Sequence, residues 1–427
     1  TVAVYSEADE ESLHTQLADE AICIGPGPSA QSYLNMEQII SATMVSGADA
    51  IHPGFGFLSE NARFAELCEK CGITFVGPPS KVIRMLGNKK IARSTMIAAG
   101  VPVVPGSEGD VEDIETGLKE AERIGYPVII KAALGGGGKG MRVANTPEEF
   151  PEAYATARKE SEIAFGDGTM YIEHFVVNPR HIEFQILADS FGNVIHLGER
   201  DCSIQRNHQK MIEESPSAAV SSELREKMGH AAVTAAKAAG YVNAGTIEFL
   251  LEPDGKFWFM EMNTRIQVEH PVTEWVTGID LVKEQLKIAS GMPLEISQED
   301  VRIQGHAIEC RINAENPQKN FRPSPGTIQG AHFPGGNGIR VDTCVYNGCK
   351  IPPYYDSMLA KLIVHAGNRK EAIAKMQSAL GEVIIDGIDT NIDYQYEILK
   401  DEDYQSGNFD TGFLASHIIA GVKINEN

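Results

Sequence analysis

Apolar and polar positions follow two alternating patterns over the first 80 residues. Short apolar runs typical of strands occupy residues 2–5, 21–24, 50–51 and 73–76. Helical patterns lie between them at 36–45 and at 61–71, where Gly72 follows the last turn. Strands that alternate with helices are typical of parallel sheets covered by helices, so this region predicts an α/β layer.

The next hundred residues predict a helix and then a compact unit. The pattern at 81–100 indicates one long helix. The unit at 103–176 combines helices, the first at 111–124, with strands at 127–132, 141–144 and 170–175. A glycine-rich loop joins the first two strands, so we expect a flap-like hairpin that could act as a lid.

The rest of the chain is richer in strands. Residues 178–303 also contain two amphipathic helices, one at 224–238 that Gly240 ends and one at 275–289. Residues 304–427 begin with short strands and turns and finish with helices. The predicted fold class is therefore α/β with an α+β central part. We predict three domains, at 1–80, at 81–303 with the lid 103–176 inside it, and at 304–427.

Composition narrows the class of protein. The chain has 427 residues, with 59 acidic and 37 basic side chains and a net charge of −22. Such a chain repels polyanions, which argues against binding to nucleic acid or to an acidic membrane. No apolar run reaches about 18 residues, so no membrane-spanning helix is expected. Seven scattered cysteines and the lack of a signal peptide predict reduced thiols and a cytoplasmic location.

The glycine loop is the first candidate for chemistry. It has the sequence LGGGGKG at 134–140, with Lys131 before it and Lys139 inside it. Backbone N–H groups without neighbouring side chains can close around phosphate oxygens. Gly140 stands where a Walker A loop has Ser or Thr, and a strand rather than a helix follows, so a dinucleotide fingerprint is also disfavoured. We predict a lid over phosphates, with a flexible surface hairpin as the alternative.

A hairpin at 246–263 predicts a metal site. Asp-Gly at 254–255 is a strong signal for a two-residue turn. Centring the turn there places Glu248 opposite Glu261, with Asn263 on the same face. Opposed carboxylates in apolar strands are destabilising unless a cation lies between them, and this oxygen donor set suits Mg²⁺. The same face would carry an apolar floor for a flat ring, formed by Leu250 and Phe259. A register shift of one residue is the alternative.

Polar residues at alternate positions follow this hairpin. In an extended chain Arg265, Gln267 and Glu269 would point one way and the two apolar residues between them the other. An arginine fork suits a planar oxyanion and the carboxylate could take a proton, so the set suits a small oxyacid such as bicarbonate. Residues 181–185, HIEFQ, show the same alternation. A solvated strand face is the alternative for both segments.

Two further polar groups stand out. Gln205, His208 and Lys210 form a cluster with little structural need, in which the lysine is a donor for an anion. Arg311 lies in a strand-like run, where a buried arginine needs an acidic partner. Glu269 is the candidate partner.

With these strings the chain resembles the biotin carboxylases of the ATP-grasp superfamily over essentially its whole length. The most specific strings are HPGFGFLSE at 52–60, the glycine loop, ERDCS at 199–203, EMNTRIQVEH at 261–270 and PPYYDS at 352–357. The resemblance implies an ATP-grasp fold with an N-terminal Rossmann-like domain, a mobile glycine-rich lid and a strand-rich C-terminal domain. The family opens with a further strand and helix, so the chain, which starts at Thr1, is expected to be truncated.

The resemblance also implies roles for individual residues. Lys89 and Lys131 would bind ATP phosphates and Gly137 and Gly138 would cover them. The adenine and the rest of the nucleotide would be held by Glu173, His174, Phe175, Val176, His181, Gln205, His208 and Leu250. Glu248, Glu261 and Asn263 would carry Mg²⁺ or Mn²⁺. Bicarbonate would be held by Lys210, Arg265, Gln267 and the backbone of Val268. Glu269 would be the base and Arg311 would steady the biotin oxyanion.

The implied reaction is ATP-dependent carboxylation of biotin by bicarbonate through carboxyphosphate. The chain has no biotin attachment string of the Met-Lys-Met type, so the biotin would come on a separate carrier protein. This resembles the stand-alone subunit of bacterial acetyl-CoA carboxylase, a homodimer that works with carboxyltransferase subunits in fatty acid synthesis. The biotin carboxylase part of a pyruvate, propionyl-CoA or methylcrotonyl-CoA carboxylase is the alternative. A nucleotide-binding regulatory module and a dinucleotide oxidoreductase are disfavoured.

Overall fold

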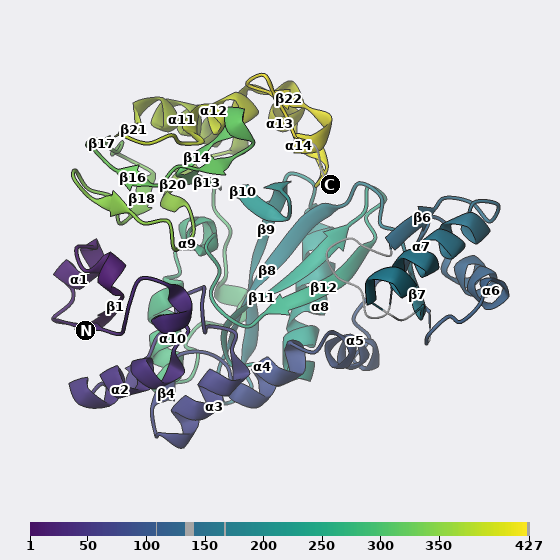
Figure 1. Ribbon diagram of the computed structural model, residues 1–427, viewed down its shortest axis with the longest axis horizontal. Helices are drawn as coiled ribbons and strands as arrows, with labels where there is room; N and C mark the ends of the chain where they lie inside the picture. The colour runs from purple at the N-terminus through teal and green to yellow at the C-terminus, as the bar shows by residue number, and fades with distance from the viewer. Residues whose placement is uncertain (108, 133–140, 166–167, 425–427) are drawn as a thin grey trace. The chain divides into compact units, whose positions relative to one another are not determined.

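The computed structural model describes residues 1–107, 109–132, 141–165 and 168–424, which form two compact units (Figure 1). The larger unit comprises Thr1–Val101, Arg180–Phe249 and Glu261–Asn427. The smaller unit comprises Pro102–Pro179 and Leu250–Met260. Each unit has its own buried apolar clusters.

The N-terminal part of the larger unit has the predicted parallel strands. β1 (Val2–Tyr5) pairs in parallel with β2 (Glu20–Cys23), and β3 (Ala50–Ile51) with β4 (Thr74–Phe75). The helices between them are α1 (Leu13–Leu17), α2 (Met36–Ser46) and α3 (Ala62–Lys70). Their apolar sides close a cluster around Ile24, Ile40 and Phe64. The alternation of strands and helices is thus confirmed.

The single helix predicted at 81–100 is wrong. The structure has two helices, α4 (Ser80–Leu86) and α5 (Lys89–Ala98). Gly87 ends the first helix, and the side chain of Asn88 accepts a hydrogen bond from the backbone N–H of Ile91 at the start of the second. A glycine followed by an asparagine cap is a stop and a start signal, which outweighs the continuous apolar pattern.

The smaller unit is a three-stranded antiparallel sheet with two helices. The strand order is β6 (Met141–Ala144), β5 (Val128–Ala132), β7 (Met170–His174). α6 (Ile114–Ile124) and α7 (Phe150–Phe165) pack against it around buried Val128, Ile130 and Phe150. α6 starts three residues later than predicted because Asp113 caps it, and Val111 before it bonds to the edge of β7. The predicted lid glycines at 135–138 lie outside the described residues.

The larger unit is built on an eight-stranded sheet. The order is β12, β11, β8, β9, β10, β13, β20, β18. Their bounds, in chain order, are β8 Arg180–Ala188, β9 Val194–Arg206, β10 Gln209–Ser215, β11 Asn243–Leu251, β12 Phe257–Asn263, β13 His306–Asn313, β18 Ile339–Thr343 and β20 Met358–Ala366. The pairings from β8 through β18 in this order are antiparallel. One sheet therefore joins strands from the middle of the chain to strands near its C-terminal end.

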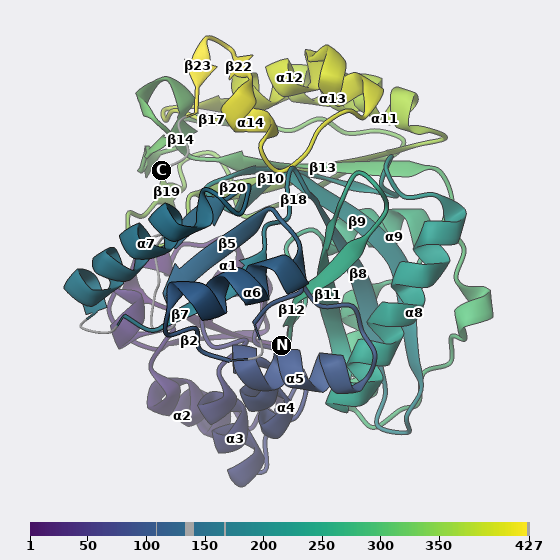
Figure 2. The same ribbon diagram turned by 90° about the vertical axis from the view of Figure 1, so that its right-hand side faces the viewer.

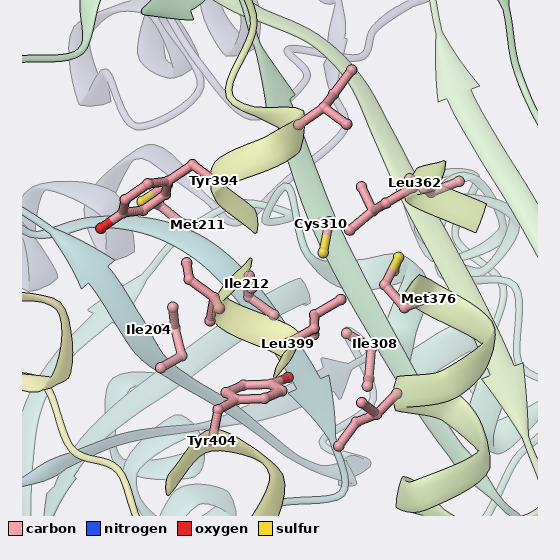
Figure 3. Packing of buried hydrophobic residues seen from close by; sticks show 14 of the residues in the cluster. Ile204, Met211, Ile212, Ile308, Cys310, Leu362, Met376, Tyr394, Leu399 and Tyr404 are labelled. Atoms are coloured by element: carbon pink, nitrogen blue, oxygen red, sulfur yellow. The ribbon is translucent and has the colours of Figure 1, made fainter. Parts of the chain in front are cut away.

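Helices cover this sheet. α8 (Ser222–Ala239) packs on β8 and β9, and Gly240 ends it as predicted. α11 (Arg369–Glu382) and α12 (Ile392–Lys400) lie against β13 and β20, as Figure 2 shows near its top. Figure 3 shows the cluster beneath them, where Ile308, Leu362 and Leu399 meet. The remaining elements are α13 Glu402–Ser406, α14 Phe413–Ser416, β14 Glu315–Asn316, β15 Arg322–Pro323, β16 Gly326–Thr327, β17 Gly330–His332, β19 Lys350–Ile351, β21 Ile384–Asp386, β22 Ile418–Ile419 and β23 Val422–Lys423.

The helix predicted at 275–289 is also two helices. α9 (His270–Thr277) ends at Gly278, whose φ of 72° is the left-handed conformation that glycine adopts easily. α10 (Leu281–Ala289) starts after Asp280, whose side chain accepts a hydrogen bond from the backbone N–H of Lys283. In the described part of the chain, no helix combines the length and the apolar character needed to cross a bilayer.

Candidate active site in the larger unit

A fully buried arginine is the centre of the polar cluster. Arg200, on β9, has no exposed surface. Its guanidinium donates to side chains from three neighbouring parts of the fold, at 2.5 Å to Glu183, 2.7 Å to Gln185, 3.0 Å to Thr273, 3.2 Å to Thr246 and 2.9 Å to Gln267. A charge is tolerated inside a protein only when it is paired and fully hydrogen-bonded. Arg200 therefore ties β8, β11 and α9 to one point.

Lys210 lies beside this arginine network and contacts three carboxylates. Its Nζ is 2.6 Å from Glu183, 2.6 Å from Glu269 and 3.0 Å from Glu248. Burial alone would lower the pKa of Lys210, but Cys202 and these three acids together outweigh burial and raise the pKa well above its usual value. Lys210 follows the tight turn between β9 and β10, which directs its side chain across β9 to β8 and β11.

Arg311 shares Glu269 with Lys210. Its guanidinium donates to Glu269 at 2.9 Å, which confirms the partner predicted from the sequence, and to Glu213 at 2.6 Å. Burial disfavours the ionised form of Glu269, but Lys210 and Arg311 outweigh burial and hold its pKa well below the usual range. Two cations, on β10 and β13, therefore converge on one carboxylate at the start of α9.

Glu248, on β11, is surrounded by donors. It accepts from Asn263 at 2.8 Å and Gln267 at 2.9 Å, in addition to Lys210, and His181 Nε2 lies 3.0 Å from it. Burial opposes its ionisation, but Lys210 and His181 lower its pKa below the usual value. The alternation predicted at 181–185 is confirmed as a strand whose polar side chains face this cluster rather than water.

The residues predicted to hold a metal affect one another electrostatically. Partial burial, followed by the negative charge of Glu248, raises the pKa of Glu261. A divalent cation near both carboxylates would remove this repulsion, and Asn263 adds an amide oxygen. The donor set therefore fits a hard cation. His181, Glu183 and Glu248 also have ligand atoms within 4.8 Å of one another, but Lys210 Nζ already bonds to two of them.

The turn of the β11–β12 hairpin differs from the prediction. The backbone N–H of Glu252 donates to the carbonyl of Lys256, and Gly255 donates to the carbonyl of Glu252. The loop therefore has three residues, 253–255, and the pairing beside it is shifted by one residue from the predicted register. Pro253 favours the second position of a type I turn, and Gly255, with φ of 88°, supplies the left-handed residue that follows it. Pro253 therefore favours the three-residue loop over the two-residue turn that was predicted.

The segment after β12 is not the extended strand that was predicted. β12 ends at Asn263, and residues 264–269 form a bend and a turn that lead into α9. Gln267 and Glu269 still face the cluster, whereas Arg265 bonds to Glu60 at 3.1 Å and to Asn263 at 3.2 Å. The carbonyl of Val268 accepts from Lys361 at 2.9 Å. The polar residues converge because the turn, not strand alternation, aims them.

The other predicted nucleotide residues lie in several places. In the larger unit, Lys89 is exposed in the first turn of α5, where its charge partly opposes the rise in the pKa of Glu261. Gln205 is buried, and His208 is exposed in the β9–β10 turn. In the smaller unit, Lys131 forms an ion pair with Glu173, and His174 contacts Glu252 at 3.6 Å. Phe175, Val176 and Leu250 are half-buried there. Gly137 and Gly138 lie outside the described residues.

Four residues of the cluster were not singled out from the sequence. They are Glu60, Glu183, Arg200 and Glu213. Glu60, Glu183 and Arg200 lay inside strings that were noted, and the signal for Glu183 and Arg200 was a charged residue in an otherwise apolar strand pattern. Such a residue needs a buried partner, but the pattern does not say which one.

Comparisons with known proteins show the same family over nearly the whole chain. Three family profiles match: "Biotin carboxylase, N-terminal domain" at residues 1–83, "Carbamoyl-phosphate synthase L chain, ATP binding domain" at 88–297 and "Biotin carboxylase C-terminal domain" at 309–416. Biotin carboxylase 1 of Bacillus subtilis is 58% identical over 99% of this chain and 94% of its own length. The biotin carboxylase of Haemophilus influenzae is 55% identical over 97% of this chain and 92% of its own length.

Solved structures of similar proteins carry nucleotides. The biotin carboxylase of Campylobacter jejuni in complex with β,γ-ATP has a TM-score of 0.87 at 50% identity, over 97% of this chain and 93% of its own. The biotin carboxylase domain dimer of Hydrogenobacter thermophilus 2-oxoglutarate carboxylase, with MgADP, ADP and bicarbonate, has a TM-score of 0.86 at 50% identity. That match covers 98% of this chain and 92% of its own.

Proposed function

The chain belongs to the biotin carboxylase family, and from this premise we propose that the cluster around Lys210 and Glu269 activates bicarbonate. The enzyme is an ATP-dependent ligase with an ATP-grasp fold. The observation that carries the proposal is that two cations, Lys210 and Arg311, share the single carboxylate of Glu269. A cation that now binds the carboxylate of Glu269 could bind an oxyanion of the substrate in its place.

In the proposed mechanism Lys210, Arg265, Gln267 and the backbone of Val268 hold bicarbonate, and Glu269 takes its proton. A general base works best when its pKa is near the working pH, and the pKa of Glu269 is held far below this by its cations. When Lys210 turns to bicarbonate, Glu269 loses part of this support and becomes a stronger base. The bicarbonate oxygen then attacks the γ-phosphate of ATP, which gives carboxyphosphate and ADP.

We assign the nucleotide and metal roles as the family resemblance suggests. Glu248, Glu261 and Asn263 would hold Mg²⁺ or Mn²⁺, which supplies charge neutralisation for the phosphates when bound. Phosphates would be bound by Lys89, Lys131, Gly137 and Gly138, and the nucleoside by Glu173, His174, Phe175, Val176, His181, Gln205, His208 and Leu250. The solved relatives with MgADP or ATP analogues support these assignments at the level of the family.

Carboxyphosphate would break down to CO₂ and phosphate, which takes the proton from the biotin ring nitrogen, while Arg311 steadies the ureido oxyanion. We propose that the biotin arrives on a separate carrier protein and that carboxyltransferase subunits use the product. The stand-alone bacterial relatives favour the first half-reaction of acetyl-CoA carboxylase, in fatty acid synthesis. A homodimer in the cytoplasm fits the dimeric relative. The component of a pyruvate, propionyl-CoA or methylcrotonyl-CoA carboxylase is the second candidate, since relatives of this kind are also similar.

The proposed function is tested by ATP hydrolysis that depends on bicarbonate, measured with and without free biotin. We expect bicarbonate to be required and biotin to stimulate ADP release. A rate of ADP release that changes with neither bicarbonate nor biotin would reject the proposal.

Arg311→Gln is expected to damage biotin carboxylation more than basal ATP hydrolysis. A donor aimed at a developing oxyanion contributes about 10²–10³-fold to turnover. The measurement compares carboxybiotin formation with bicarbonate-dependent ADP release in the same preparation. Arg302→Gln, at an exposed arginine, is the matched control. Equal loss of both activities would argue against the assigned role.

Glu261→Gln is expected to raise the Mg²⁺ concentration needed for half-maximal activity by about 10–100-fold, as weakened metal sites do. The amide keeps the size of the side chain but removes the charge that pairs with a cation. A Mg²⁺ titration at saturating ATP measures the shift. Glu299→Gln, in an exposed 3₁₀ turn, should leave the titration unchanged. If Glu261→Gln required the same Mg²⁺ concentration as the unmodified protein, the metal assignment would be wrong.

A further inference from the structure

Two buried carboxylates face each other behind Arg311. Glu213 on β10 and Glu309 on β13 are direct partners in the antiparallel register, and neither has any exposed surface. Side chains at such positions start from Cβ atoms only about 5 Å apart, and two like charges there destabilise a sheet. Neither residue has a role in the reaction proposed above.

The hydrogen bonds around this pair leave one carboxyl group without a donor. Arg311 is committed to one oxygen of Glu213 and to Glu269. Among the described residues, the second oxygen of Glu213 and both oxygens of Glu309 have no hydrogen-bond partner. A buried carboxylate without donors is very costly, so a proton on one of the two groups is the simplest way to satisfy both.

The charged groups that face Glu309 do not change this result. Glu213 faces it from β10, Arg311 is on its own strand, and Glu269 faces it from the start of α9. Lys361 faces it from β20, but its ammonium bonds to the carbonyl of Val268 at 2.9 Å and lies 3.3 Å from Asp342. The cations around Glu309 are thus already engaged by other acceptors.

The electrostatics agree with the geometry. Burial, only partly opposed by Lys361 and reinforced by Glu213, raises the pKa of Glu309 well above its ordinary value. Burial also raises the pKa of Glu213 to about 7, against the effect of Arg311. Since Glu213 is the group that accepts from Arg311, the last proton of the pair belongs on Glu309.

We propose that Glu309 is a neutral carboxylic acid that donates its proton to Glu213, and that this acid pair positions Arg311 for biotin. With the proton in place, Glu213 offers Arg311 a single negative charge and leaves the rest of the guanidinium to Glu269. An ionised Glu309 would add a second negative charge behind Arg311 and draw it away from Glu269. Glu309 is thus a positioning residue that acts through Glu213. The role of Arg311 rests on the proposed function, but the proton does not.

Infrared difference spectra of the ligand-free protein test the proton directly. We expect the carbonyl stretch of a neutral carboxylic acid at neutral pH to be present in the unmodified protein and lost in Glu309→Gln. Glu214→Gln is the matched control, because Glu214 is also buried, on the neighbouring strand β10, but is ionised, as an acceptor from His306 and Arg369. Its spectrum should keep the band. A band that persists in Glu309→Gln, or that is missing from the unmodified protein, overturns the proposal.

The pH dependence of the free energy of unfolding provides a second test. A carboxyl whose native pKa is raised stabilises the fold at low pH, and this contribution is lost as pH rises from about 4.5 through the native pKa. Unfolding measured from mildly acidic to alkaline pH should therefore show a loss for the unmodified protein that Glu309→Gln escapes. Parallel curves would contradict the proposal. If Glu309→Gln does not fold, the acid band of the ¹³C-glutamate-labelled unmodified protein is titrated instead, and must persist above pH 7.

Kinetics then separate positioning from a merely structural role. Glu309→Ala removes the donor to Glu213 and should lower turnover with biotin by about 10–100-fold, mainly through a higher KM for biotin. Glu309→Gln keeps a neutral donor and should rescue most of this loss, with less decline at alkaline pH. Equal defects in the two variants would overturn the positioning role. An acid band without any bicarbonate-dependent ATP hydrolysis would instead reject the proposed function and leave the acid pair standing.

Discussion

Replacing Arg200 with methionine is expected to lower the free energy of unfolding by about 3–5 kcal/mol, because it removes one of the two cations that pair with the buried carboxylate of Glu183. Arg200 is fully buried and donates to five side chains, of which Glu183 is ionic. Methionine fills a similar volume but supplies no donor. Glu183 would keep only Lys210, and the hydroxyls and amides that now meet Arg200 would lose their partner.

Urea denaturation, followed by circular dichroism, measures this effect. Arg302→Met is the control, because Arg302 is exposed and its change should stay within about 0.5 kcal/mol. The double variant Arg200→Met with Glu183→Gln should recover part of the loss, since the abandoned charge is also removed. A loss below about 1 kcal/mol for Arg200→Met would show that the network is not needed for stability.

Glu269→Gln is expected to lower bicarbonate-dependent ATP hydrolysis by about 10²–10⁴-fold, the usual contribution of a general base. Glutamine has the shape of the glutamate but cannot accept the proton, and it no longer balances Lys210 and Arg311. Nucleotide binding should be much less affected, because Glu269 is not among the residues assigned to ATP.

Initial rates of ADP release at saturating bicarbonate, together with ATP binding by calorimetry, check this result. Glu284→Gln is the matched control: Glu284 is also buried and ion-paired, but with Lys287 on its own helix α10. It should keep nearly full activity. If Glu269→Gln hydrolyses ATP within threefold of the unmodified rate, the base must be another group.

Much of the fold could be predicted from residue patterns. The strands at 2–5, 50–51 and 141–144 begin and end where the apolar runs predict, because a short apolar run with polar flanks has few other ways to be buried. The predictions that failed did so at local signals that the periodicity hides. Gly87 with Asn88, and Gly278 with Asp280, each divide a predicted helix in two.

The β11–β12 hairpin was predicted at the right place but with the wrong loop length. Asp254 and Gly255 do form the turn, but Pro253 makes the loop one residue longer and shifts the pairing beside it. The negative charge of Glu248 still contributes to raising the pKa of Glu261. The metal assignment, the other site roles and the three-domain division remain predictions.

The residue strings alone are enough to predict which residues carry the chemistry. Strings that hold Lys210, Glu269 and Arg311 indicate the family, and a charged residue within an apolar strand implies a buried partner. Only the tertiary structure shows which residue is the partner of each buried charge. β11 lies beside β8, and β13 beside β10, so Glu248 reaches Lys210 and Glu309 faces Glu213 across long stretches of chain. The order and register of strands come from packing the whole sheet against its helices, and no local pattern of residues contains that information.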